Sequence, residues 1–175
     1  HGSEEGLETL LGYQLFSIGN RADSAALVYQ VDYVLDGYVK KAGTNFVLSV
    51  GRLIGSQPEL KGEHSLPKED IYWEMPRCYQ WDITVNLPEG YRISPEGLER
   101  LNVKVENDCG AFIVQATTED GTLRIKAEKR INHKTEPVAN WEKLLEITDA
   151  ANSYEALSIV FQATINPPTS PTTGY

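Results

Sequence analysis

The stretch "AFIVQATTEDGTLRIKAEKRI", residues 111–131, decides the fold class. Its first part is apolar enough for a central strand, and its second part alternates through Leu123, Ile125 and Ala127. Between the two lies Asp120-Gly121, a strong hairpin signal, because glycine accepts the positive φ that tight hairpin turns require. The stretch therefore predicts two antiparallel strands joined by a tight turn.

The same period of two residues recurs on both sides of this hairpin. "QWDITVNL" (80–87) places Trp81, Ile83, Val85 and Leu87 on one face, as in a half-buried antiparallel strand. Further strands are predicted from "LVYQVDYV" (27–34), "NFVLSVGRLI" (45–54), "LNVKVE" (101–106) and "ALSIVFQA" (156–163). The chain is thus predicted to be mainly β, an antiparallel β-sandwich that is immunoglobulin-like in general architecture.

One segment near residues 138–150 has helical spacing instead. Its apolar stripe is predicted to consist of Val138, Trp141, Leu144, Leu145 and Thr148. Pro137 fits the first turn of such a helix, because its missing N–H would be unpaired there in any case. We expect Trp141 to pack this helix against the sheet.

Composition shifts suggest how the chain is divided. Residues 1–26 are expected to be an N-terminal extension or junction, and residues 27–164 the β-sandwich domain. The polar loop at 55–70 is a candidate internal boundary, and the Pro/Thr-rich tail at 165–175 is expected to be linker-like. The first methionine is Met75, so we expect a segment of a larger polypeptide.

The charge balance excludes several classes of partner. The chain has 16 basic and 25 acidic residues, a net charge of −9. Nucleic acids and anionic membrane surfaces both require clustered Lys and Arg, so neither is expected as a partner. No apolar run approaches the length of a membrane span. No metal, phosphate-loop or cofactor motif is present, and no cofactor is expected.

The densest stretch in aromatic residues is "YWEMPRCYQWDITVNLPEGY", residues 72–91. Alternation places Tyr79 and Trp81 on the apolar face of the predicted strand, so we expect both to pack in the core. Tyr72 and Trp73 precede that strand and are the candidate contact aromatics.

The two cysteines, Cys78 and Cys109, open strands that would run parallel in a simple meander. Both would then lie at one end of the sheet, where a disulfide bond and two free thiols are equally open alternatives. A thiol enzyme would need a nearby base, and His64 and His133 are the candidates, although neither lies in a catalytic motif.

Several motifs in order resemble a known family. They are "GRLIG.Q", a "P..Y.W" lead into a strand, "LPEGY", "EN..GAF" and "NW..LLE..DAA" before the last strand. Together they resemble the C-terminal β-sandwich domain of unknown function that follows a transglutaminase-like core in secreted bacterial proteins. The resemblance covers most of residues 27–163.

This resemblance implies a periplasmic or cell-surface location and an upstream transglutaminase-like domain as partner. It also implies that the catalytic core lies outside this chain, so the expected function is a non-catalytic accessory module. Such a module would support or position the core or mediate protein contacts. An oxidising compartment would favour the Cys78–Cys109 disulfide. The alternative functions are a carbohydrate or cell-wall binding module that uses exposed aromatics and, third, a thiol enzyme.

Overall fold

The computed structural model describes residues 7–20, 25–58, 67, 69–73 and 76–164. The chain forms two compact units, residues 1–40 and residues 41–175. The division therefore falls after Lys40 and not after residue 26, because the strands on either side of residue 26 pair with each other. The tail at 165–175 and most of the 55–70 loop, including His64, lie outside the described residues.

The first unit is a two-stranded antiparallel hairpin made of β1 (Leu7–Asn20) and β2 (Ala25–Leu35). The strand predicted at 27–34 is confirmed, whereas the strand at Leu7–Asn20 had no clear signal in the sequence. The register of the hairpin shifts at Glu8, Leu11 and Phe16, and at each of these positions one residue of β1 has no partner on β2. Such bulges increase the local twist of a hairpin.

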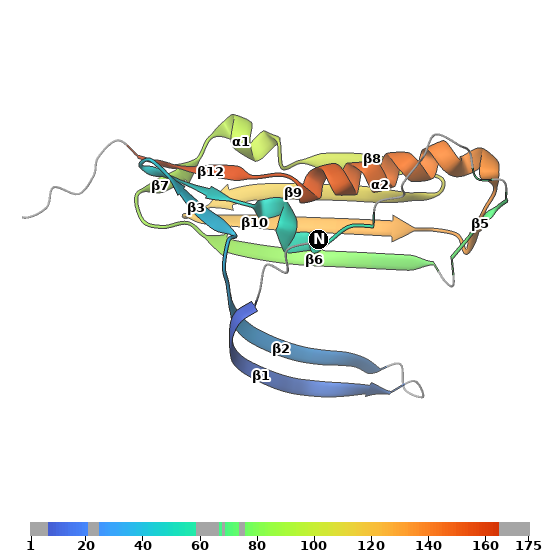
Figure 1. Cartoon of the computed structure of the whole chain (residues 1–175), viewed down its shortest axis with the longest axis horizontal. Helices are drawn as coiled ribbons and strands as arrows, with labels where there is room; N and C mark the ends of the chain where they lie inside the picture. Colours follow the sequence, from blue (N-terminus) through green and yellow to red (C-terminus); the bar gives the residue numbers. More distant parts are fainter. Residues whose placement is uncertain (1–6, 21–24, 59–66, 68, 74–75, 165–175) are drawn as a thin grey trace, which may run out of the picture. The chain divides into compact units, whose positions relative to one another are not determined.

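The main sheet of the second unit has four antiparallel strands in the order β6-β10-β9-β8. Its strands are β6 (Arg77–Asn86), β8 (Val103–Asn107), β9 (Gly110–Glu119) and β10 (Thr122–Ile131). The predicted turn is confirmed, since Asp120 and Gly121 join β9 to β10 with φ values of 48° and 72°. Figure 1 shows β6 at one edge of this sheet, beside β10.

A second four-stranded sheet has the order β3-β4-β12-β7. Its strands are β3 (Val39–Ala42), β4 (Asn45–Leu48), β7 (Tyr91–Ile93) and β12 (Ile159–Ala163). The strand predicted at 45–54 ends at Leu48, and the 3-10 helix η1 (Val50–Ile54) follows it. A short pair, β5 (Ile71–Tyr72) with β11 (Thr135–Glu136), joins the ends of two loops.

The predicted helix is confirmed: η2 (Val138–Asn140) leads into α2 (Trp141–Glu155). Figure 1 shows α2 running along β8 and β9, both of which it contacts. Its buried stripe consists of Leu144, Ile147, Thr148, Ala151 and Tyr154. Trp141 and Leu145, which were predicted to belong to this stripe, are only half-buried. A further short helix, α1 (Pro95–Glu99), was not predicted; Ser94 caps it by accepting the Gly97 N–H at 3.0 Å.

The core lies between α2 and the inner face of the main sheet. Phe112 of β9 and Tyr154 of α2 are both fully buried and meet edge to face, with ring centroids 5.8 Å apart. The inner face of β10 is formed by Leu123, Ile125, Ala127, Lys129 and Ile131, all of them buried. The prediction of a mainly β antiparallel fold with one late helix is therefore confirmed.

Candidate functional sites

The structure separates the two aromatic residues predicted as contact residues. Tyr72 is 63% exposed, and Lys134 Nζ lies 5.2 Å from the centre of its ring. Trp73 is half-buried, and its indole N–H is enclosed without a hydrogen-bond partner among the described residues. Tyr72 is thus free to touch a partner, whereas Trp73 faces inward.

Tyr79 and Trp81 of β6 are less buried than predicted. Their rings stack with centroids 6.0 Å apart, and Tyr79 is 47% exposed. Alternation does place both on the inner face of the sheet, but β6 is an edge strand, where the helix does not cover that face. The prediction that both pack in the core is therefore wrong for Tyr79 and only partly correct for Trp81.

A cavity of about 350 Å³ opens beside these rings. Its walls are mostly apolar and aromatic and include Trp73, Tyr79, Trp81, Ile131 and Thr148, together with Gln57 and Lys129. Mostly apolar cavities that hold a few convergent polar groups are typical of ligand and peptide sites. The aromatic stretch predicted from the sequence thus forms one wall of a cavity.

Lys129 is the polar group that distinguishes this cavity. It lies on the inner face of β10 and is 6% exposed, and burial lowers the pKa of its ammonium group. Its Nζ donates a hydrogen bond to Gln57 Oε1 at 3.1 Å. Sequence reasoning overlooked Lys129, although the alternation through Leu123, Ile125 and Ala127 continues directly to it.

Gln57 is held in place so that its carbonyl oxygen faces Lys129. Its Nε2 donates to the backbone oxygens of Ile54 and Gly55 at 3.2 and 3.1 Å. Its backbone N–H donates to Glu155 Oε2 at 2.6 Å, at the end of α2. The loop after η1 is thereby fixed to both the helix and the sheet around the cavity.

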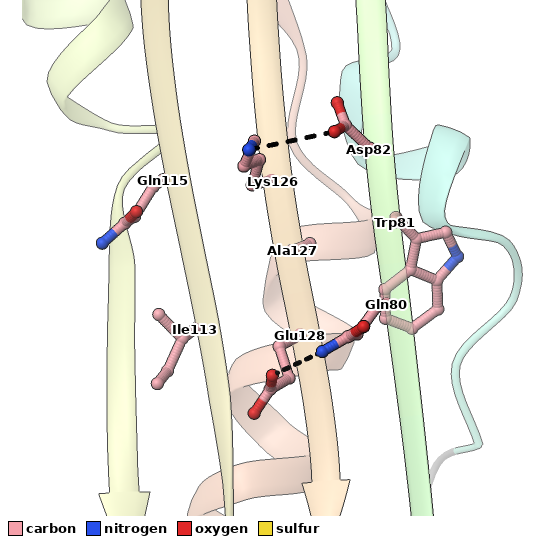
Figure 2. Close-up of a pocket in the computed structure, with 8 residues that line it drawn as sticks. All are labelled: Gln80, Trp81, Asp82, Ile113, Gln115, Lys126, Ala127 and Glu128. Carbon is pink, nitrogen blue, oxygen red and sulfur yellow. Dashed lines mark hydrogen bonds and ion pairs between the residues drawn. The ribbon is translucent and has the colours of Figure 1, made fainter.

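The outer face of the main sheet has a different character (Figure 2). Gln80 Nε2 donates to Glu128 Oε2 at 3.0 Å, and Lys126 Nζ lies 4.0 Å from Asp82 Oδ2. Figure 2 shows the Trp81 ring across β6 from Lys126 and Glu128. Exposed pairs of this kind contribute about 0–1 kcal/mol each, so we interpret this face as a solvated surface.

Of the two alternatives for Cys78 and Cys109, a disulfide and two free thiols, the structure has the free thiols. The prediction that they lie at one end of the sheet is correct, because Arg130 of β10 pairs with Cys78 on one side and with Ala111 on the other. Strand β10 therefore lies between the two cysteines, and two strand spacings amount to about 9–10 Å. Disulfides need Cα atoms within about 7 Å. Cys78 is also exposed, whereas Cys109 is fully buried.

Cys109 belongs to a buried polar cluster around Glu136. Glu136 is 1% exposed and accepts hydrogen bonds from His133 Nδ1 at 2.6 Å and Asn140 Nδ2 at 2.8 Å. Burial, followed by the charge of Glu136 and a hydrogen bond to it, raises the pKa of the Cys109 thiol to about 11. A nucleophilic cysteine requires the opposite shift, so this environment disfavours the thiol-enzyme hypothesis.

The hairpin of the first unit is amphipathic over its central part. Tyr13 and Tyr29 share one face, with ring centroids 6.2 Å apart, while Gln14 and Gln30 pair on the other. Exposed apolar side chains of this unit are Leu10, Leu11, Tyr13, Leu15, Phe16, Ile18, Leu27, Val28, Tyr29 and Val34. By the register, Val28 and Val34 lie on the Gln14 face, whereas the other face carries Leu10, Tyr13, Leu15, Ile18, Leu27 and Tyr29. Several exposed apolar residues on one face usually mark an interaction site.

Among the described residues, no group of His, Cys, Asp and Glu has the arrangement of a metal site. None of the helices in the described ranges has the length and apolarity needed to span a bilayer.

Comparison with known proteins gives a partial likeness. No protein-family model and no solved structure matches the chain. A stretch of 96 residues is 34% identical to a protein named glucose-6-phosphate 1-dehydrogenase from Aggregatibacter actinomycetemcomitans. The match covers 54% of this chain and 18% of that protein. The chain thus spans less than a fifth of the length of this relative.

Proposed function

We propose that the chain is a non-catalytic accessory module of a larger exported protein, and that it docks on a neighbouring domain through its β1–β2 hairpin. The single observation that carries the proposal is the exposed apolar surface of this hairpin. A two-stranded hairpin is marginally stable by itself in water, so an amphipathic one gains stability when a partner covers its apolar face. The neighbouring domain proposed from the family resemblance is a transglutaminase-like core, in a periplasmic or cell-surface protein.

The exposed side chains favour a protein partner over a carbohydrate ligand. Carbohydrate platforms use flat, neighbouring, exposed aromatic rings, whereas only Tyr72 of the two candidate residues is exposed and Trp73 is half-buried with its indole N–H enclosed. The hairpin instead offers apolar side chains over two strands, as protein interfaces do. We therefore favour protein contacts over glycan binding.

The test separates the apolar surface from the fold of the hairpin. Tyr13 and Leu15 flank Gln14 on β1, so their side chains lie on the face opposite Gln14, and they are 62% and 44% exposed. In the longer polypeptide, Y13S/L15S is expected to lower the melting temperature of the neighbouring domain. The same pair is expected to abolish co-purification when that domain and this chain are expressed separately.

The matched control replaces Gln14 and Gln30, which lie on the opposite face of the hairpin, with serine. This control is expected to leave both the melting temperature of the neighbouring domain and the co-purification unchanged. The proposed function fails if removal of the whole hairpin leaves the stability and activity of the neighbouring domain as they were.

A further inference from the structure

Strand β6 offers a free sheet edge. It is the last strand in the order β6-β10-β9-β8, and no described strand pairs with its other side. It runs for 10 residues, from Arg77 to Asn86. Long free edges can accept the backbone of another extended chain.

The hydrogen-bonding phase of the sheet shows which residues of β6 face outward from this edge. Leu87 N–H donates to Gly121 O on the β10 side at 2.8 Å. Backbone groups of a strand alternate in direction, so odd-numbered residues of β6 bond to β10 and even-numbered residues point to the free edge. The backbone groups of Gln80 and Asp82 are therefore available to an added strand.

The side chains of β6 also alternate, with odd-numbered residues on the inner face of the sheet and even-numbered residues on the outer face. Tyr79 and Trp81 point to the inner face and line the cavity, whereas Gln80 and Asp82 point to the outer face. A strand added beside β6 would direct every second side chain to the inner face, next to Tyr79 and Trp81. The cavity is thus placed to receive a side chain of that strand.

The polar groups of the cavity define what that side chain should carry. The Lys129 ammonium group has three donors, and the structure engages one of them, with Gln57. The enclosed Trp73 Nε1–H has no partner among the described residues, and Arg77 lines the same cavity. The Gln57 oxygen is the acceptor that Lys129 already engages, and the charge of Glu155 also acts on Lys129. The Trp73, Arg77 and remaining Lys129 groups are donors, two of them on cations, and a carboxylate is the acceptor that suits them.

We propose that the free edge of β6 binds an extended segment of a partner protein, and that an acidic side chain of this segment enters the cavity and pairs with Lys129. Main-chain hydrogen bonds to Gln80 and Asp82 hold the segment, and the donors of the cavity select its acidic residue. This site lies within the second unit and does not depend on the hairpin or on the proposed function.

The experiment uses the whole chain and a blocked synthetic peptide, Thr-Val-Thr-Glu-Thr-Val-Thr. Amide hydrogen exchange is measured by NMR with and without the peptide. Slower exchange is expected at Gln80 and Asp82, whose amides face the free edge. The amides of Tyr79 and Trp81 already bond to β10 and serve as an internal control within the same strand. A peptide with glutamine in place of glutamate is expected to bind about 10- to 100-fold more weakly, because a charge-assisted hydrogen bond is lost.

Two variants test the donors. Lys129→Met keeps the length of the side chain and removes its charge, and Trp73→Phe keeps an aromatic ring and removes the N–H. Each is expected to remove most of the difference between the glutamate and glutamine peptides. Lys126→Met, on the exposed face of the same strand, is the matched control and is expected to preserve that difference. If Lys129→Met does not fold, Trp73→Phe alone decides.

Three results would overturn the proposal. The first is the absence of binding by the glutamate peptide, and the second is equal binding of the glutamate and glutamine peptides. The third combines two observations. A small apolar acid, indole-3-propionate, binds and its binding depends on Lys129, while the peptide fails to slow amide exchange at Gln80 and Asp82. That third result would assign the cavity to a free carboxylic acid and leave the β6 edge without a role.

Discussion

Glu136 Oε1 lies 2.6 Å from Nδ1 of His133, although the Glu136 side chain is 1% exposed and the His133 side chain 55%. The contact joins the end of the β10–β11 connection to the segment that leads into α2. It therefore links an exposed imidazole to a buried carboxylate at the end of β11, just before η2.

Acid should weaken the fold through Glu136. Burial alone would raise the pKa of this carboxyl, but hydrogen bonds from Asn140, His133 and Cys109 hold it below its usual value. An acid whose pKa is lowered in the folded state contributes stability above its unfolded pKa of about 4.3 and loses it as the pH falls through the folded pKa. Unfolding in urea, measured between pH 7 and pH 3, is expected to show this loss.

Glu136→Gln isolates the contribution of the carboxylate. The variant is expected to lose about 1.5–3 kcal/mol at neutral pH, because hydrogen bonds to a charged acceptor become neutral ones. Its stability should then fall less steeply with acid than that of the natural chain. Glu142→Gln, at an exposed position of α2, is the control. Equal acid sensitivity of the natural chain and Glu136→Gln would contradict this prediction.

The two thiols are expected to differ sharply in reactivity. Cys78 is exposed, whereas Cys109 is buried and its pKa is raised to about 11, chiefly by burial. Alkylation at neutral pH should therefore modify Cys78 in the folded chain and both cysteines after unfolding. Cys78→Ser should leave the folded chain almost unreactive. Peptide mapping by mass spectrometry without reduction gives the check, and a peptide bridging Cys78 and Cys109 would contradict the free-thiol state.

The sequence predicts strands well where each one buries a single face. β9 and β10 are such strands, since their alternation matches the burial of Phe112, Val114, Leu123 and Ile125, and Asp120-Gly121 fixes their register. The cysteines were correctly placed at one end of the sheet for the same reason. The sequence left a disulfide and two free thiols as equal alternatives, because the order β6-β10-β9 depends on long-range pairing, which alternation does not encode.

The candidate cavity was harder to predict, because alternation shows which face a residue occupies but not what covers that face. Tyr79 follows the same pattern as the buried residues of β10, yet it is largely exposed because β6 is at the edge. Lys129 shows the converse, a charged residue at a core position of the pattern. A lysine in phase with buried apolar residues was the signal that could have located the cavity.

Gly51 is expected to tolerate no side chain. Its N–H donates to Leu157 O at 3.0 Å, and a Cβ at this position would lie 1.8 Å from the backbone oxygen of Tyr154. Gly51→Ala must therefore push η1 away from the end of α2, at a cost of about 3 kcal/mol or more by analogy with severe overpacking.

Gly43→Ala is the comparison for Gly51→Ala. Gly43 has a φ of 64° but open space where a Cβ would be, so alanine should cost only the strain of the left-handed backbone, about 1–2 kcal/mol. Urea unfolding of both variants measures the difference. A loss for Gly51→Ala no larger than that for Gly43→Ala would mean that η1 does not pack as closely on α2 as the structure has it.

Removal of the Tyr154 hydroxyl should stabilise the chain. The side chain is 1% exposed, and its hydroxyl has no hydrogen-bond partner among the described residues. Tyr154→Phe keeps the edge-to-face contact with Phe112 and removes the buried polar atom, so we expect a gain of about 1–3 kcal/mol.

The pH dependence of Tyr154→Phe distinguishes this cause from a general packing effect. Burial raises the pKa of Tyr154 to about 12, so the folded state holds its proton more tightly than the unfolded state. The contribution of this tightly held proton to the free energy of unfolding is fully present below the unfolded pKa of about 10. It is lost as the pH rises through the folded-state pKa. The advantage of Tyr154→Phe, measured by urea unfolding, should therefore grow between pH 8 and pH 11. A constant difference over that range would mean that the hydroxyl is solvated in the folded chain.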